Sequence, residues 1–250
     1  MYTDLEAQLH DLFWNQEDVL SELPLLEKFY DGKASLEIGC GSGRLLLPLL
    51  ENGLEIDGVE ISSEMTDLLK VAADSKGLNP SVVTADILDF TTSKIYDRVS
   101  VPAFTAQLLD RAGFRTMLSN MLDYTSSDAK AYLTLFIPWA EIAGELPEGD
   151  WYPDHEAKLT DGSLAQCKTK FSINRLQQAL ARKHQYTVTA KNGKKKTHRS
   201  AQDLQWYTLP ELNLILEATG WQLETLITDL EEDTQPDSDA HILTLVIKKS

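Results

Sequence analysis

Three glycines at alternate positions, Gly39, Gly41 and Gly43, follow an apolar, strand-like run, and a leucine-rich segment comes directly after them. Glycine tolerates positive φ and has no Cβ, so a ligand can approach the bare main chain of such a turn. Further along, Glu60 closes a second apolar run. A carboxylate in that place can accept hydrogen bonds from both hydroxyls of a ribose. The sequence therefore predicts a binding site for a ribose-containing ligand.

The spacing of the glycines distinguishes two classes of cofactor. The dinucleotide-binding pattern is G-x-G-x-x-G. Counted from Gly39, its third glycine would fall on Arg44, whereas the third glycine here is Gly43 and an acid, Glu37, precedes the loop. The missing glycine disfavours a nicotinamide-dependent oxidoreductase, which stays as the alternative enzyme.

The E-x-G-x-G-x-G pattern that starts at Glu37 resembles the class I S-adenosylmethionine (SAM)-dependent methyltransferases. The likeness continues through Glu60-Ile-Ser-Ser-Glu-Met65 and Leu209-Pro-Glu-Leu and covers nearly the whole chain. It is nearest to the amino-sugar and glycine N-methyltransferase-like groups. The resemblance implies an enzyme that moves a methyl group from SAM to an N or O atom of a small-molecule acceptor by in-line displacement. The non-enzyme alternative keeps the fold, lacks activity and serves as a partner-binding subunit.

The resemblance also implies roles for individual residues. The glycine loop would lie under the cofactor, Glu60 would bind its ribose, and Asp86 would accept a hydrogen bond from the adenine amino group, with Asp89 as a rival. Asp86 could instead cap a turn, and Met65 and Ile61 could be ordinary helix packing. The expected cofactor residues are Glu37, Gly39, Cys40, Gly41, Gly43, Glu60, Ile61, Met65, Asp86, Ile87 and Pro102.

The resemblance also implies that the segment after the fourth expected strand faces the acceptor. Aromatic faces attract a sulfonium or an amine through cation–π interaction. Thr105 could equally cap the helix that follows, and each aromatic taken singly could be simple packing. Methyl transfer depends on alignment of the reacting groups, so no general base is assigned. The expected acceptor contacts are Tyr2, Phe104, Thr105, Gln107 and Trp139.

Composition limits the possible partners. The chain has 250 residues, 42% of them apolar, and a net charge of -16. Such an acidic chain repels phosphate backbones, so neither nucleic acid nor an anionic membrane is expected as a partner. The two cysteines, Cys40 and Cys167, predict no disulfide, and no His, Cys or Asp spacing predicts a metal site. The absence of a signal peptide or apolar span predicts a cytoplasmic protein, and a homodimer is possible.

The elements that would position these residues follow from the hydrophobic patterns. Alternating strands and helices predict an α/β fold with a doubly wound, mostly parallel seven-stranded sheet. Residues 1–137 and 207–250 would form the SAM-binding domain. Residues 138–206 would be an antiparallel insertion, a lid or a dimer contact, with a hairpin at Asn192-Gly193. The expected strands span about 34–39, 55–60, 81–85, 97–101, 129–137, 165–173, 181–189, 195–207, 221–229 and 242–248. The expected helices span about 43–52, 62–73, 106–123 and 208–220, after two helices within 4–30.

Overall fold

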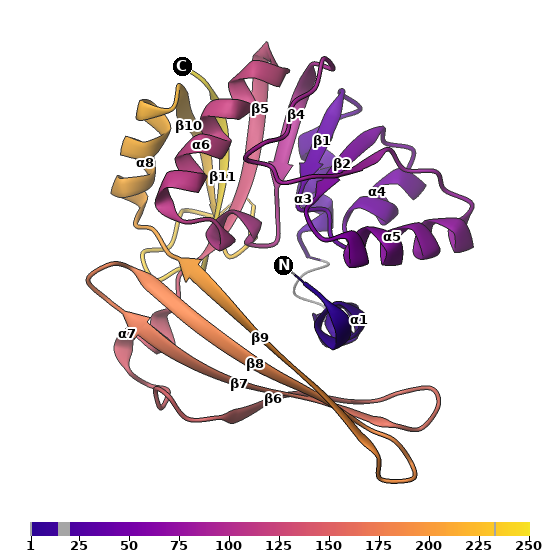
Figure 1. The fold of residues 1–250 in the computed structure, drawn as a ribbon. Coiled ribbons are helices and arrows are strands. Elements are labelled where there is room, and N and C mark those ends of the chain that lie inside the picture. The colour runs from indigo at the N-terminus through magenta and orange to yellow at the C-terminus, as the bar shows by residue number, and fades with distance from the viewer. Residues whose placement is uncertain (1, 15–20, 233) are drawn as a thin grey trace.

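The computed structural model describes residues 2–14, 21–232 and 234–250, and of Trp14 only its main chain. The chain forms two β-sheets, and helix α1 (Asp4–Trp14) lies between them (Figure 1). Sheet A has seven strands in the order β10-β11-β5-β4-β1-β2-β3. Strand β11 runs antiparallel to its neighbours and the remaining pairs are parallel. This confirms the predicted doubly wound, mostly parallel sheet. Its strands are β1 Ser35–Ile38, β2 Ile56–Glu60, β3 Val82–Thr84, β4 Tyr96–Val101, β5 Thr125–Phe136, β10 Trp221–Thr228 and β11 Ile242–Lys249.

Helices cover both faces of sheet A, and each face has its own apolar core. Helices α3 (Leu23–Tyr30), α4 (Leu46–Glu51) and α5 (Ser63–Lys76) pack on one face. Helices α6 (Arg111–Met121) and α8 (Leu209–Ala218) pack on the other. Burial of apolar side chains on both faces is the usual reason that a parallel sheet is stable. The order of strands reverses between β1 and β4, and ligands of such sheets bind beyond the carboxyl ends of the strands at that point.

Two predicted helices differ from the observed ones at their starts. The helix expected over 43–52 begins only at Leu46, because the glycine turn occupies the preceding residues. The helix expected over 106–123 is divided into a 3₁₀ turn, Thr105–Leu108, then α6, then a second 3₁₀ turn, Leu122–Tyr124. Leu109 is extended, and the Asp110 carboxylate accepts from the amide of Gly113 at 2.7 Å, which caps a new helix.

The insertion forms sheet B, with four strands rather than the three expected. They are β6 Tyr152–Lys158, β7 Leu164–Asn174, β8 Ala179–Thr189 and β9 Lys195–Gln205, paired in that order, after a short helix α7 Trp139–Ala143. Strand β6 is short and lacks a continuous apolar face, so its sequence resembles a loop. The hairpin at Asn192-Gly193 is confirmed, and its turn has three residues, with Gly193 at φ 81°.

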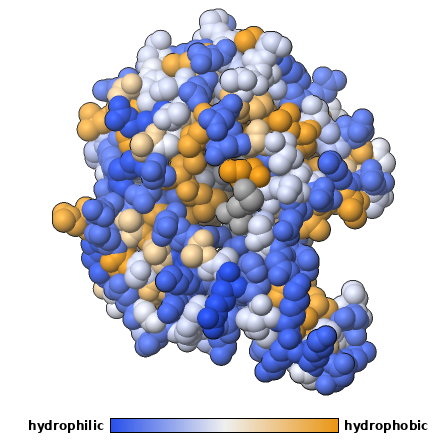
Figure 2. All heavy atoms as spheres, in the orientation of Figure 1, coloured by the Kyte–Doolittle hydropathy of each residue, from blue (hydrophilic) through white to orange (hydrophobic). Residues whose placement is uncertain are grey.

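Helix α1 packs on sheet B. Leu5, Leu9 and Phe13 form an apolar cluster with Ala165, Cys167 and Tyr186 of β7 and β8. In space-filling view the surface is mostly hydrophilic, and hydrophobic residues gather near the middle, where the two sheets approach each other (Figure 2). No helix among the described residues is long and apolar enough to cross a membrane.

Candidate active site

The glycine loop follows β1 and has the backbone that its composition predicts. Gly39, Gly41 and Gly43 have φ of 74°, 54° and 85°, a region that side chains with a Cβ rarely adopt. A Cβ on Gly39 would collide with the side chain of Thr105. The amides of Gly39 and Cys40 donate to the carbonyl of Val59 on β2, at 2.7 and 3.2 Å. The loop is thus fixed to the neighbouring strand, with its main chain against a cavity.

The Glu60 carboxylate lies at the end of β2 and connects this loop to helix α5. Its Oε2 accepts from the amide of Gly41 at 3.0 Å, and its Oε1 accepts from the amide of Ser62 at 2.8 Å. The Ser62 hydroxyl caps α5 by accepting from the Met65 amide at 3.2 Å and donates to the carbonyl of Tyr2 at 2.6 Å. Two backbone donors therefore orient the carboxylate, which borders the cavity and is 6% exposed.

A cavity of about 420 Å³ lies beyond the carboxyl ends of the central strands, between sheet A and the wall made by α1 and β9. Its volume is in the range of small-molecule sites. Of the predicted cofactor residues, Gly43 alone does not line it. This glycine packs beneath the turn, where a Cβ would meet Leu47 and Leu69. The cofactor candidates that line the cavity are Glu37, Gly39, Cys40, Gly41, Glu60, Ile61, Met65, Asp86, Ile87 and Pro102.

The Glu37 carboxyl is the most unusual group in the cavity wall. It is 1% exposed, and its Oε2 has no hydrogen-bond partner among the described residues. Burial, with the nearby Glu22 carboxyl as a second cause, raises the pKa of Glu37 to about 8. A buried carboxyl without a partner is costly, so its place on the cavity favours a ligand that brings a positive charge or hydrogen-bond donors.

Asp86 lines the cavity and also caps a turn, and its contact with adenine stays a prediction. Its Oδ1 accepts from the amide of Leu88 at 2.9 Å. The rival acid Asp89 is not part of the cavity wall. Cys40 also borders the cavity, and burial, as the largest cause, raises the pKa of its thiol well above the ordinary value. The thiol is therefore neutral at physiological pH and contributes shape to the site.

The predicted acceptor contacts divide into two groups. Tyr2 and Thr105 line the cavity. Phe104 does not line it and packs edge-on against the ring of Phe136, with ring centroids 5.2 Å apart. Trp139 lies at the start of α7 and donates to the carbonyl of Ala240 at 2.9 Å. The structure therefore brings two of these residues to the site and places the others elsewhere.

Gln107 also lies outside the cavity wall, because it joins the two sheets. Its amide nitrogen donates to the carbonyls of Phe136 and Gln205, at 3.0 and 2.9 Å, and its oxygen accepts from the amide of Phe136 at 2.7 Å. The side chain is 0% exposed. Its hydrogen-bonding groups are engaged by the main chain, and the residue does not line the cavity in which a methyl acceptor would bind.

Several residues of the cavity wall were not predicted from the sequence. Four of the polar ones come from α1 and β9, which close the cavity opposite the glycine loop, whereas Ser42 and Arg44 lie in the loop and directly after it. Glu6 is 3% exposed, its Oε1 accepts from the Ser200 hydroxyl at 2.8 Å and from the Gln202 amide at 3.3 Å, and burial raises its pKa. No pattern around Glu6 separates it from the other acids of an amphipathic helix. The unpredicted polar members of the wall are Glu6, His10, Ser42, Arg44, Gln202 and Asp203.

The residues present fit SAM. The main chain of the glycine loop is open to the cavity, Glu60 is held in place for a diol, and Glu37 has an oxygen without a partner. SAM carries a ribose, an ammonium and a sulfonium, so it would supply hydroxyl groups to one acid and positive charge to the other.

Comparisons with known proteins agree with this description. Residues 36–128 match a family model described as a methyltransferase domain. The sequence gives no match to curated proteins. Solved structures do match over nearly the whole chain. An S-adenosylmethionine-dependent methyltransferase from Clostridium acetobutylicum is 12% identical, with a TM-score of 0.79 and coverage of 97% of this chain and 96% of that one.

Two further structures have similar folds. The CcbJ methyltransferase from Streptomyces caelestis is 19% identical, with a TM-score of 0.75 and coverage of 97% and 96%. The sugar N-methyltransferase KedS8 from Streptoalloteichus is 18% identical, with a TM-score of 0.72 and coverage of 100% and 96%. These likenesses establish the fold, and the family match covers the glycine loop, Glu60 and Asp86. Residues 36–128 therefore match a methyltransferase domain, and the chain as a whole has the fold of these solved methyltransferase structures.

Proposed function

We propose that this enzyme methylates an N or O atom of a small molecule, and that the preferred acceptor is an amine. The observation that carries the proposal is the charge of the cavity wall. Five carboxyl groups line it, from Glu6, Glu37, Glu60, Asp86 and Asp203, against the basic side chains of Arg44 and His10. Acidic groups in the wall of a cavity favour cations and disfavour anions there. An amine that arrives protonated suits this wall better than a carboxylate or a phosphate.

The residues of the chain would act by placement and by removal of a proton. SAM, when bound, supplies a methyl group on a sulfonium that already has a good leaving group. An ammonium acceptor must lose its proton before its lone pair can attack, so it needs a nearby base. The Oε1 atom of Glu6 is held by Ser200 and Gln202, while among the described residues Oε2 has no hydrogen bond. We assign this carboxylate as the group that binds and deprotonates the amine.

Two measurements test the proposal in sequence. Calorimetry should detect SAM binding, and mass spectrometry should detect S-adenosylhomocysteine and a methylated product in a panel of amines and matched hydroxyl compounds. The panel begins with amino sugars, because KedS8 is a sugar N-methyltransferase. Preference for a hydroxyl compound over its amine would refute the amine assignment. SAM binding without turnover on any acceptor would favour the inactive, partner-binding alternative.

We also propose that the chain has two parts. Residues 1–137 and 207–250 form the SAM-binding domain, and residues 138–206 form an inserted antiparallel subdomain. Helix α1 belongs to the first segment in sequence, yet its apolar face packs on sheet B. The insertion would therefore act together with α1 as one cover over the cavity. Deletion of residues 2–14 should therefore reduce the enzyme's preference among methyl acceptors more than it reduces SAM affinity.

A further inference from the structure

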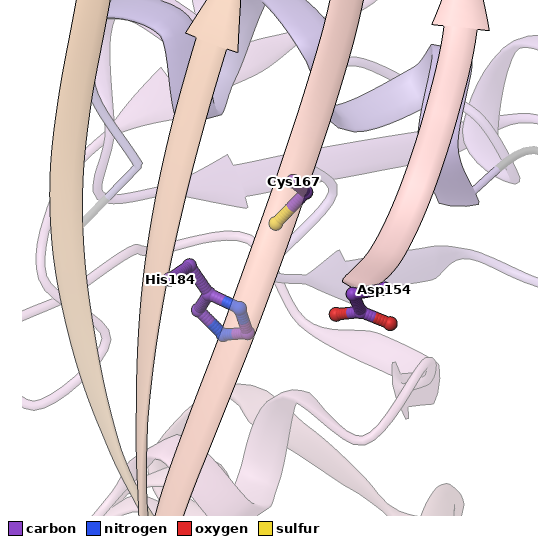
Figure 3. Close-up of side chains that lie close together, drawn as sticks. All are labelled: Asp154, Cys167 and His184. Atoms are coloured by element: carbon purple, nitrogen blue, oxygen red, sulfur yellow. The ribbon is translucent and has the colours of Figure 1, made fainter. Parts of the chain in front are cut away.

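Three side chains of sheet B form a cluster that the methyltransferase site does not use. They are Asp154 on β6, Cys167 on β7 and His184 on β8, and their ligand atoms all lie within 4.8 Å of one another (Figure 3). None of the three lines the cavity. We propose that this cluster binds a divalent transition metal ion of the zinc class. The donors sit on three separate strands, which explains why no short spacing motif predicted the site.

The strand register aims the three donors at one point. Thr169 pairs with His184 across β7 and β8, and Cys167 lies two residues before Thr169, on the same face of the sheet. The pairing of β6 with β7 shifts between Pro153 and His155, so Asp154 is the extra residue of a β-bulge. Bulges turn a side chain away from the regular alternation and are frequent next to functional sites. Here the bulge directs the Asp154 carboxylate toward the cysteine and the histidine.

The hydroxyl of Thr169 marks the point on which the donors converge. Its oxygen lies 2.5 Å from Oδ2 of Asp154, 2.7 Å from Nδ1 of His184 and 3.9 Å from Sγ of Cys167. Zinc binds oxygen and nitrogen at about 2.0–2.2 Å and sulfur at about 2.3 Å. Rotation of Thr169 about χ1, with small inward movements of the donors, would free a position of that size.

The donor types select the ion. One sulfur, one imidazole nitrogen and one carboxylate oxygen suit zinc or a similar transition metal, whereas magnesium and calcium prefer oxygen donors. On binding, the thiol of Cys167 gives its proton to solvent and coordinates as the thiolate. Asp154 has a second partner, because Nε2 of His155 lies 3.5 Å from its Oδ1. Such outer contacts orient metal ligands in known sites.

The position of the cluster indicates a structural role. Cys167 and His184 are buried, and the Asp154 side chain is 22% exposed, which leaves a path for the ion. Cys167 is also part of the apolar cluster against which α1 packs. A bound ion would therefore fasten β6, β7 and β8 together directly beneath α1, at a place separate from methyl transfer.

Cobalt and zinc titration of the full-length, chelator-treated protein tests the site. Co²⁺ bound by a thiolate gives visible absorption and a sulfur-to-metal charge-transfer band, and we expect both at one equivalent of cobalt. Zinc at 100 times its dissociation constant should raise the melting temperature by roughly 5–10 °C. Cys167→Ala should abolish the charge-transfer band. Cys40→Ala, the matched control at the other cysteine, should keep it.

A further variant guards against the possibility that the first one fails to fold. Thr169→Ala removes the hydroxyl from the centre of the cluster, so it should lose stability without metal and regain it with zinc. A wild-type protein that shows no charge-transfer band, or a band that persists in Cys167→Ala, would overturn the proposal. So would a Thr169→Ala variant whose melting temperature zinc leaves unchanged, because the cluster would then be only a hydrogen-bonded network.

Discussion

Replacement of Glu37 by glutamine should stabilise the unliganded protein and weaken SAM binding at the same time. The reason is the buried carboxyl, which has an oxygen without a partner and a pKa raised to about 8 by burial, with Glu22 as a further cause. Its folded pKa lies above the reference value of 4.5, so the folded protein keeps a proton that the unfolded chain releases. Folding stability therefore falls as pH rises from about 4.5 to about 8, and this loss is absent below that window.

The size of the effect follows from the shift. One pKa unit corresponds to about 1.4 kcal/mol, so a rise from 4.5 to about 8 costs on the order of 5 kcal/mol once pH exceeds both values. The Glu37→Gln side chain stays neutral at every pH. The gap in unfolding free energy between variant and wild type should thus grow by about 1.4 kcal/mol per pH unit between pH 5 and 8.

Urea unfolding at pH 5, 6, 7 and 8 measures this gap. Glu55→Gln, at an exposed position of the surface, is the matched control and should show no such growth. Calorimetry at pH 7 in two buffers of different ionisation enthalpy gives the second readout. If a cationic ligand ionises Glu37, binding should release up to ~0.9 proton in the wild type and none in Glu37→Gln. A gap in unfolding free energy between wild type and Glu37→Gln that stays constant from pH 5 to pH 8 would refute the reasoning.

The remaining predictions concern single contacts. Gly39→Ala places a Cβ against Thr105 and should reduce SAM affinity at least tenfold by calorimetry. Gly53 also has positive φ but lies in open space, so Gly53→Ala is the control: it should cost about 1 kcal/mol in urea unfolding and leave SAM affinity unchanged. Glu60→Gln should weaken SAM binding roughly 10- to 100-fold by calorimetry, because a neutral amide replaces a charged acceptor. Gln107→Leu leaves buried backbone groups unpaired and should cost about 3 kcal/mol in thermal unfolding without changing acceptor preference. Glu6→Gln should lower the rate of amine methylation roughly 100-fold while SAM affinity is retained, and equal losses in both would contradict its role as a base.

The glycine loop and Glu60 could be placed from the sequence because their signals are local. A turn with positive φ at Gly39, Gly41 and Gly43 needs glycine whatever surrounds it, and an acid at the end of β2 meets the loop through strand pairing alone. Alternating strands and helices likewise predict a doubly wound, mostly parallel sheet.

The cavity wall made by α1 and β9 could not be predicted in the same way, because long-range packing decides it. Glu6 reaches the cavity only because the apolar face of α1 packs on sheet B, some 160 residues away in the sequence. The position of Gln107 directly after the loop that follows β4 predicts a contact with the methyl acceptor. It turns inward instead, since the main chain at Phe136 and Gln205 supplies hydrogen-bond partners that no local pattern shows.

The loop after β4 also lines the cavity and is itself under strain. Ala103 and Phe104 both have positive φ, 51° and 63°, which costs about 1–3 kcal/mol for each residue without glycine's freedom. Buried contacts offset this cost. The Glu22 carboxylate accepts from the amide of Ala103 at 3.2 Å and from the hydroxyl of Thr134, and Gln107 holds the far end of the loop. Burial raises the pKa of Glu37 and the nearby Glu22 carboxyl adds to this rise, so the group that holds the loop after β4 also favours the protonated form of Glu37.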